Sequence, residues 1–149
     1  MKLEEEIKQK KFRTEKQKAI LNIYYTNCFI TSKVEALLKE FDLTTQQFNV
    51  LRIIRGQNGK AIPIGEIKKR MIDRSSDVSR IVERLRLKKL LERKIRPQDR
   101  RQMDVKITQG GLDLLKKIDA IEIQFDDILS NISENKVKQL NSLLDKIRG

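Results

Sequence analysis

The sequence predicts a mainly α-helical protein with one small β-hairpin. Apolar residues recur at the three- and four-residue spacing of amphipathic helices over most of the 149 residues. Between residues 75 and 108 this pattern changes to a short helix and two strand-like segments around a Pro-containing tip. A short helix with a charged hairpin behind it is the outline of a winged helix-turn-helix. We therefore expect a winged lobe at 42–108, with added dimerisation helices at 1–41 and 109–149.

Residues 1–41 are predicted to form one long helix with a frayed start. From Ile20 to Phe41 the apolar side chains step at threes and fours, and no Pro or Gly interrupts them. Before residue 18 the pattern thins into Lys and Glu. We expect that portion to be exposed or to pack on a second subunit.

A second helix is predicted to begin at Thr44. The run Thr44-Thr45-Gln46-Gln47 has a capping-box pattern, in which the Thr44 side chain caps the helix and Gln47 bonds back. The helix should end near residues 56–59, Gly-Gln-Asn-Gly, which are a strong turn signal.

The helix-turn-helix is expected next. Residues 61–64 suit a short edge strand, because an edge tolerates Pro at its end. A brief helix at 66–71 and a second one at 75–88 then form the helix-turn-helix. In the second helix one stripe at i, i+3, i+4 and i+7 should be buried, namely Val78, Ile81, Val82 and Leu85.

The opposite face of the 75–88 helix carries polar and guanidinium groups that can reach base edges and phosphates in a major groove. They are Ser75, Ser76, Asp77, Ser79, Arg80, Glu83 and Arg84. Ser75 or Ser76 is also expected to cap the helix. Arg80 and Arg84 lie one turn apart and could contact guanine edges or phosphates. The alternative is a surface ion network with Asp77 and Glu83, which would be worth only tenths of a kcal/mol.

The segment 109–149 is predicted to form two helices. Thr108 should cap the first, which runs to about residue 130, with Gly110 and Gly111 allowing close backbone approach. Ser133 should cap the last helix. A winged helix is complete by residue 108, so the apolar stripes of the flanking helices need a partner. The simplest partner is a second copy of the chain, and the alternative is that these helices cap their own domain.

Charge is concentrated in the middle of the chain. Residues 60–108 hold 16 Lys/Arg and 7 Asp/Glu, a net +9, within a total of +12. Residues 1–59 carry +4 and residues 109–149 carry −1. A solubilising surface would not need this asymmetry, and a surface that meets a polyanion would. Double-stranded DNA is therefore the expected partner.

Several classes of protein are excluded by composition. No run of eighteen apolar residues suggests a membrane span, and the N-terminus lacks the apolar core of a signal peptide. One Cys and no His argue against an internal disulfide and a metal site, and no cofactor is expected. Paired carboxylates such as Asp126 and Asp127 have no companion nucleophile, so we expect no enzyme. These features are typical of a cytoplasmic protein.

Four runs of residues together resemble the MarR family of bacterial transcriptional regulators. They are Ser79–Leu85, then Leu91-Glu92-Arg93, then Asp99-Arg100-Arg101, and finally Ile107–Gly111. The resemblance implies a dimer whose termini intertwine. Two departures concern local turns. Lys89 stands where the family often has Gly, so the left-handed helix cap should form in another way. Asp73-Arg74 stands where a small residue is common.

The wing tip is expected to contact DNA. The resemblance implies that Asp99 orients Arg100 or Arg101 toward a narrow minor groove; the alternative is an ion pair that only stiffens the hairpin. The full set of expected DNA contacts is Ser75, Ser76, Asp77, Ser79, Arg80, Arg84, Lys94, Arg96, Asp99, Arg100 and Arg101.

The resulting hypothesis is a homodimeric repressor that binds a pseudo-palindromic operator and responds to a small-molecule effector. The family resemblance implies a small aromatic effector. The expected pocket walls, which are equally suited to a core, are Tyr24, Tyr25, Phe41 and Phe48. The alternatives are a DNA-coating protein indifferent to sequence, and a winged-helix adaptor that binds protein.

Cys28 offers another alternative, a thiol-based redox sensor. One branch of the family senses organic hydroperoxides through a Cys on the first helix. A sensing thiol needs solvent access and a lowered pKa. Cys28 lies in an otherwise apolar helix, so we expect it to be buried as a small apolar residue.

Overall fold

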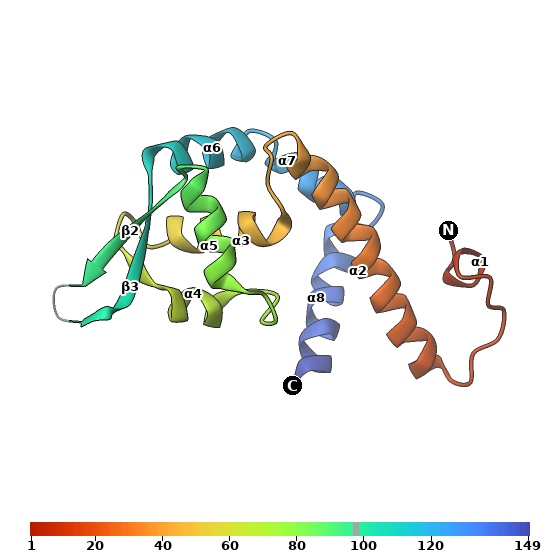
Figure 1. Cartoon of the computed structure of the whole chain (residues 1–149). Helices are drawn as coiled ribbons and strands as arrows, with labels where there is room; N and C mark the ends of the chain where they lie inside the picture. The colour runs from red at the N-terminus through yellow and green to blue at the C-terminus, as the bar shows by residue number, and fades with distance from the viewer. Residues whose placement is uncertain (97–98) are drawn as a thin grey trace.

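The computed structural model describes residues 1–96 and 99–149, with their side chains except at residues 95, 96 and 99–102. In chain order the elements are α1 Leu3–Glu6, α2 Glu15–Lys39, α3 Thr45–Arg55, β1 Ile62–Pro63, α4 Ile64–Arg70, α5 Val78–Leu87, β2 Leu91–Arg96, β3 Asp99–Ile107, α6 Gln109–Asp119, α7 Glu122–Asp126, the 3-10 turn η1 Asp127–Leu129, and α8 Glu134–Arg148. The hairpin and its neighbouring helices make a lobe, and α2 and α8 lie on the side away from the hairpin (Figure 1).

The sheet has three antiparallel strands in the order β1–β3–β2. Ile62 of β1 lies opposite Val105 of β3, and Leu91 of β2 lies opposite Ile107. The expected edge strand is confirmed, because β1 ends at Pro63 and pairs with β3 alone. The short helix and hairpin expected after residue 75 are confirmed as α5, β2 and β3.

The core of the lobe forms where α3, α5, α6 and the sheet meet. Ile54, Leu85, Val105 and Leu115 come from these four elements and are fully buried. Each such side chain stabilises the fold by roughly 1.5–3 kcal/mol when it leaves water. The lobe therefore has an apolar core of its own, which can hold α5 in a fixed orientation.

The start of α3 agrees with the capping-box prediction. The backbone N–H of Gln47 donates to the Thr44 hydroxyl at 3.2 Å, and the Thr44 N–H donates to the Gln47 side chain at 3.1 Å. Two N–H groups that the helix itself cannot satisfy are thus bonded. The helix ends at Arg55, next to the predicted turn at residues 56–59.

The prediction of one helix over 1–41 is wrong. The chain forms α1, breaks, and begins α2 at Glu15, because Thr14 caps the new helix. The N–H of Gln17 donates to the Thr14 hydroxyl at 3.1 Å, and the N–H of Arg13 donates to the Gln17 side chain at 2.7 Å. Side-chain contacts then hold α1 to α2, through Lys18 with Glu4 and Tyr25 with Glu6.

The end of α5 corrects another expectation. Lys89 itself adopts the left-handed conformation, with φ 60°, so no other residue supplies the cap. The N–H of Leu90 donates to the carbonyl of Leu85 at 3.0 Å, and the N–H of Lys89 donates to the carbonyl of Arg86 at 2.8 Å. This is the hydrogen-bond pattern of a Schellman motif. A Lys at this conformation costs more than Gly would, and the bonds hold it there.

The helix expected over 109–130 is also interrupted. Thr108 caps α6 as predicted, since its hydroxyl accepts from the N–H of Gly111 at 3.1 Å. The helix ends at Asp119, and α7 begins only at Glu122. Ser133 stands at the cap position of α8 as expected, but the structure shows no cap hydrogen bond from its side chain. None of the helices in the described ranges is long and apolar enough to cross a lipid bilayer.

Gly111 is required by close packing between the start of α6 and the end of the hairpin. A Cβ there would lie 2.4 Å from the carbonyl oxygen of Leu90 and 2.7 Å from Cγ1 of Ile107. At Gly110 the nearest atom would be 3.6 Å away, an ordinary contact. The expected close approach of the backbone is thus found at Gly111.

We predict that Gly111→Ala lowers the free energy of unfolding by about 1–3 kcal/mol, because the neighbouring backbone must move. Gly110→Ala is the matched control and should leave stability unchanged or slightly higher, since Ala favours a helix. Urea denaturation of the two variants would measure both effects. Equal losses in the two variants would contradict the packing argument.

Candidate nucleic-acid interface

One face of α5 is buried and the other is presented to solvent. Val78, Val82 and Leu85 are buried in the lobe, and α5 packs against α3, α4 and β2. The side chains of Arg80 and Arg84 are exposed. The helix is therefore fixed along its apolar stripe while its polar face is free to meet a partner.

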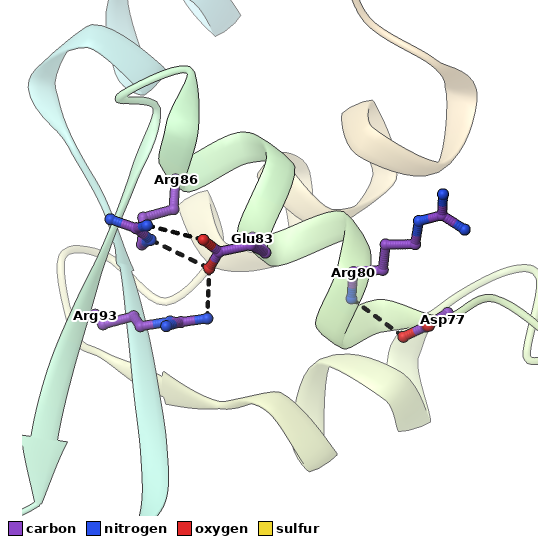
Figure 2. Close-up of polar contacts among 5 residues, drawn as sticks. All are labelled: Asp77, Arg80, Glu83, Arg86 and Arg93. Carbon is purple, nitrogen blue, oxygen red and sulfur yellow. Dashed lines mark hydrogen bonds and ion pairs between the residues drawn. The ribbon is translucent and has the colours of Figure 1, made fainter.

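The cap of α5 differs from the prediction. Asp77, and not Ser75 or Ser76, caps the helix, because its Oδ1 accepts from the N–H of Arg80 at 3.1 Å (Figure 2). The two serine hydroxyls instead donate to Asp73, at 2.6 Å from Ser75 and 3.0 Å from Ser76. These bonds, led by that from Ser75, lower the pKa of Asp73. Asp73 thus organises the turn before α5.

The surface network considered for Arg80 and Arg84 is not formed. Within the side chains that the structure describes, neither guanidinium has an ion pair. The Asp77 carboxylate accepts from a backbone N–H, and the Glu83 carboxylate accepts from the side chains of Arg86 and Arg93. Together with the exposed Ser79, these two guanidiniums form a polar face that can donate hydrogen bonds to base edges or phosphates.

Glu83 joins α5 to the hairpin. One carboxylate oxygen lies 2.8 Å from Arg86, on the same helix, and the other lies 2.5 Å from Arg93 on β2 (Figure 2). The bond from Arg86 is the largest cause that lowers the pKa of Glu83, and Glu83 in turn raises the pKa of Arg86. The carboxylate therefore stays ionised at neutral pH and holds the two guanidiniums.

The contacts of Glu83 with Arg86 and Arg93 were not predicted, although Arg93 belongs to the run Leu91-Glu92-Arg93 noted in the sequence. The i, i+3 spacing of Glu83 and Arg86 was a signal for the first pair. No local signal pointed to the pairing of Arg93 with Glu83, because the two lie on either side of the turn between α5 and β2.

The hairpin is described in part. Lys94 is exposed on β2 and lies 3.2 Å from Glu92. Four of the expected DNA contacts have side chains outside the described set, namely Arg96, Asp99, Arg100 and Arg101. The orientation expected of Asp99 toward Arg100 or Arg101 stays a prediction.

The four aromatic residues expected at an effector pocket lie apart. Tyr24 is 69% exposed on α2, and Tyr25 bonds to Glu6 at 2.5 Å. Phe41 packs against the lobe core, and Phe48 stacks on Phe125 with ring centroids 6.0 Å apart. The structure therefore groups Phe48 with α7 and not with the two tyrosines.

A groove of about 820 Å³ instead separates α2 from α5. One side comes from α2 and the turn after it, and the other from the last turns of α5. A Lys88–Asp42 ion pair of 2.8 Å ties the two sides. The residues that line the groove include Ser32, Glu35, Lys39, Arg84 and Leu87.

Cys28 is exposed on α2, so the expectation of a buried thiol is wrong for the single chain. Leu38, near the C-terminal end of α2, is the one residue of this helix that is buried, so most of the helix does not pack into the core of its own lobe. Burial thus no longer argues against a redox role. In the described part of the chain no group of His, Cys, Asp and Glu residues could hold a metal ion.

Comparison with known proteins agrees with this geometry. A model of the MarR family matches residues 41–102. The chain is 30% identical to the HTH-type transcriptional repressor IacR of Pseudomonas putida over 118 residues, which cover 78% of this chain and 70% of that protein. It is similar to the structure of a mutant MarR from E. coli complexed with operator DNA, with a TM-score of 0.80, 26% identity, and coverage of 93% of this chain and 99% of the other.

A further solved structure is that of BpsR from Bordetella bronchiseptica, described in relation to the regulation of its DNA binding by 6-hydroxynicotinic acid. It has a TM-score of 0.73 and 25% identity, and the match covers 88% of this chain and 97% of that one.

We predict opposite effects for two substitutions that remove the same charge. Glu83→Gln should weaken binding to a selected operator a few-fold, because the hairpin loses the carboxylate that ties Arg93 of β2 to α5. Glu92→Gln, on the neighbouring strand, should slightly tighten binding to operator and random DNA alike, because it removes a negative charge from the hairpin and releases Lys94 from its ion pair. Fluorescence anisotropy would measure both. Operator binding that tightens equally in the two variants would show that Glu83 does not position the hairpin.

Proposed function

The chain belongs to the MarR family of DNA-binding transcriptional regulators, and we propose that it acts as a homodimeric repressor on a pseudo-palindromic operator. Membership in a family of transcription regulators confirms the expectation that the chain is not an enzyme. As a regulator of this kind it would act in the cytoplasm.

One observation carries the proposed DNA contact. Arg80 and Arg84 are exposed and, among the described side chains, not ion-paired, on a helix whose other face is packed. They lie within the segment 60–108, which has a net charge of +9. Arg is the side chain most often used to read guanine in the major groove, through two parallel hydrogen bonds. We therefore assign α5 the reading of bases, with Ser75, Ser76, Asp77 and Ser79 at its N-terminal end near the phosphates.

The hairpin has the complementary role in this proposal. Lys94 and Arg96 on β2 would contact phosphates, and Asp99, Arg100 and Arg101 would meet the adjacent minor groove. Glu83 supports this arrangement because it ties β2 to α5. The two elements would then approach the duplex as one unit.

Dimerisation is supported by apolar side chains that the single chain leaves uncovered. On α8, Leu143 is 59% exposed and Ile147 is 66% exposed. On α2, Ile20, Ile23 and Phe29 are also exposed. Leu143 and Ile147 lie one helical turn apart, as do Ile20 and Ile23, and large apolar side chains exposed together on a helix mark an interface. A two-fold dimer through α2 and α8 would place two α5 helices in successive major grooves, about 34 Å apart.

An effector could act through the groove between α2 and α5. The groove separates a proposed dimer helix from the proposed base-reading helix. The dimer would exist with different spacings between its two DNA-binding lobes. A ligand that binds the groove more tightly at a spacing that does not fit the operator would shift the population away from the operator-bound form. Lys39 and Arg84 of the groove lining suit an acidic group. The small aromatic acid that the family resemblance implies carries such a group and is the proposed class of effector.

We predict that Leu143→Asp disrupts the dimer, because a charge would be buried without a partner in an apolar interface. Ser142→Asp places the same charge on the opposite face of α8 and should leave the dimer intact. Sedimentation should give about twice 17.5 kDa for the natural chain and for the control. A natural chain that sediments as a monomer yet binds an operator specifically would refute the proposed dimer.

We predict that Arg80→Ala or Arg84→Ala weakens operator binding by about 1–3 kcal/mol and relaxes the preference at particular base pairs. Lys94→Ala should weaken binding to operator and random DNA evenly and lower the salt slope by about one unit. Binding titrations at several salt concentrations would separate the two behaviours. The assignment of α5 fails if its arginine variants lose affinity for all sequences equally.

A further inference from the structure

Two segments of the chain carry opposite charge. Residues 8–18 hold six Lys/Arg and one Glu, a net +5. Residues 118–135 hold five Asp/Glu and no Lys or Arg, a net −5. The first segment links α1 to the start of α2, and the second runs from the end of α6 through α7 to the start of α8.

The basic segment is exposed and held in place. Lys8, Lys10, Lys11, Arg13 and Lys16 are exposed, and the described structure gives none of them an ion pair. The sixth cation, Lys18, pairs with Glu4 and lies over the ring of Phe12. The Thr14 cap and the contacts from α1 fix the loop. The backbone of this segment is therefore ordered before its cations meet a partner, which lowers the backbone part of the entropic cost of docking.

The acidic segment is likewise exposed and largely unpaired. Asp119 pairs with Arg55, at 2.7 Å, and Glu134 pairs with Lys138, at 3.0 Å. Glu122, Asp126 and Asp127 are exposed, and no ion pair to them is found among the described side chains. Three carboxylates on and beside α7 thus face solvent, and two of them, Glu122 and Asp126, line a pocket that Arg52 and Arg55 also line.

The two segments cannot meet within one chain. Helix α2 has 25 residues, and an α-helix rises 1.5 Å per residue, so its ends lie roughly 37 Å apart. The basic segment lies at its N-terminal end, while α7 lies near its C-terminal end (Figure 1). Phe125 of α7 stacks on Phe48 in the lobe, which fixes α7 at that end.

We propose that the basic segment 8–18 of one protomer docks on the acidic segment 118–135 of a second copy of the chain. This inference rests on the proposed homodimer. In a two-fold dimer such a contact forms twice, once in each direction, because each copy supplies both surfaces. The chain carries both an exposed set of unpaired cations and an exposed set of unpaired carboxylates, and this charge complementarity favours a second copy over DNA as the occupant of the basic segment.

The docking would mainly determine how the two protomers align and which chains pair. It would contribute less to the affinity of the dimer. Exposed ion pairs are individually weak and are screened by salt. Complementary charged surfaces nonetheless speed association, and like charges brought together exclude wrong partners. The apolar faces of α2 and α8 would supply the affinity, and the charged segments would align them.

The test reverses the charge of the basic segment in one variant and that of the acidic segment in another. One variant carries Lys10→Glu, Lys11→Glu and Arg13→Glu; the other carries Glu122→Lys, Asp126→Lys and Asp127→Lys. All six side chains are exposed, so the fold should survive. Each variant alone sets like charges against each other in its homodimer. Its dimer dissociation constant should rise about tenfold or more at low salt, measured by sedimentation equilibrium, and the rise should shrink as salt is added.

Mixing the two variants decides the matter. In a mixed dimer one docking pairs the two reversed segments and the other pairs the two natural ones, so both again join opposite charges. The two variants should therefore form heterodimers in preference to either homodimer, as counted by native mass spectrometry with one chain tagged. A misfolded variant could not give this rescue.

Two results would overturn the docking and leave the operator-binding dimer standing. The first is a pair of variants that dimerise as tightly as the natural chain at low salt, and the second is random mixing of the two. Loss of random-DNA affinity with an unchanged dimer would overturn it as well, and would assign the basic segment to DNA instead.

Discussion

Val78, Val82 and Leu85 are buried along one side of α5, and their burial determines which side chains of that helix face outward. Burying three such residues stabilises the lobe by several kcal/mol, far more than any surface ion pair. The orientation of Arg80 and Arg84 therefore follows from apolar packing and not from polar contacts of their own. Guanidiniums held in this way can meet a base edge with little loss of backbone entropy on binding.

A second constraint joins the packed lobe to the charged hairpin. Glu83 is placed by the same helix and contacts Arg93 on β2, so the position of the hairpin depends on the orientation of α5. At the other end of the helix, the left-handed Lys89 turns the chain directly into β2. The close contact at Gly111 fixes the start of α6 against this turn. Through α6, which leads on to α7 and α8, the hairpin is thus connected to one of the proposed dimer helices.

The sequence predicted the features whose signals are local. The cap at Thr44 needs only four residues, and it was found. The break at Thr14 was missed although Gln17 completes the same kind of signal, because no Gly or Pro marks it and the apolar periodicity begins only at Ile20. The end of α6 before α7 has no Gly or Pro to mark it. The cap at Asp77 was decided by competition, because Ser75 and Ser76 could also have capped the helix but bond to Asp73 instead. The contact between Glu83 and Arg93 depends on how β2 lies against α5, which residue spacing alone does not encode.

The most direct test of the account is selection of bound sites by the full chain from random double-stranded DNA at moderate salt. A packed α5 on each of two symmetric protomers predicts enriched sites with two inverted half-sites whose centres lie about one helical turn apart, roughly 10–10.5 base pairs. No enrichment over random sequence would show that charge alone drives binding. A single half-site without a symmetric partner would contradict the dimeric reading of DNA by two α5 helices.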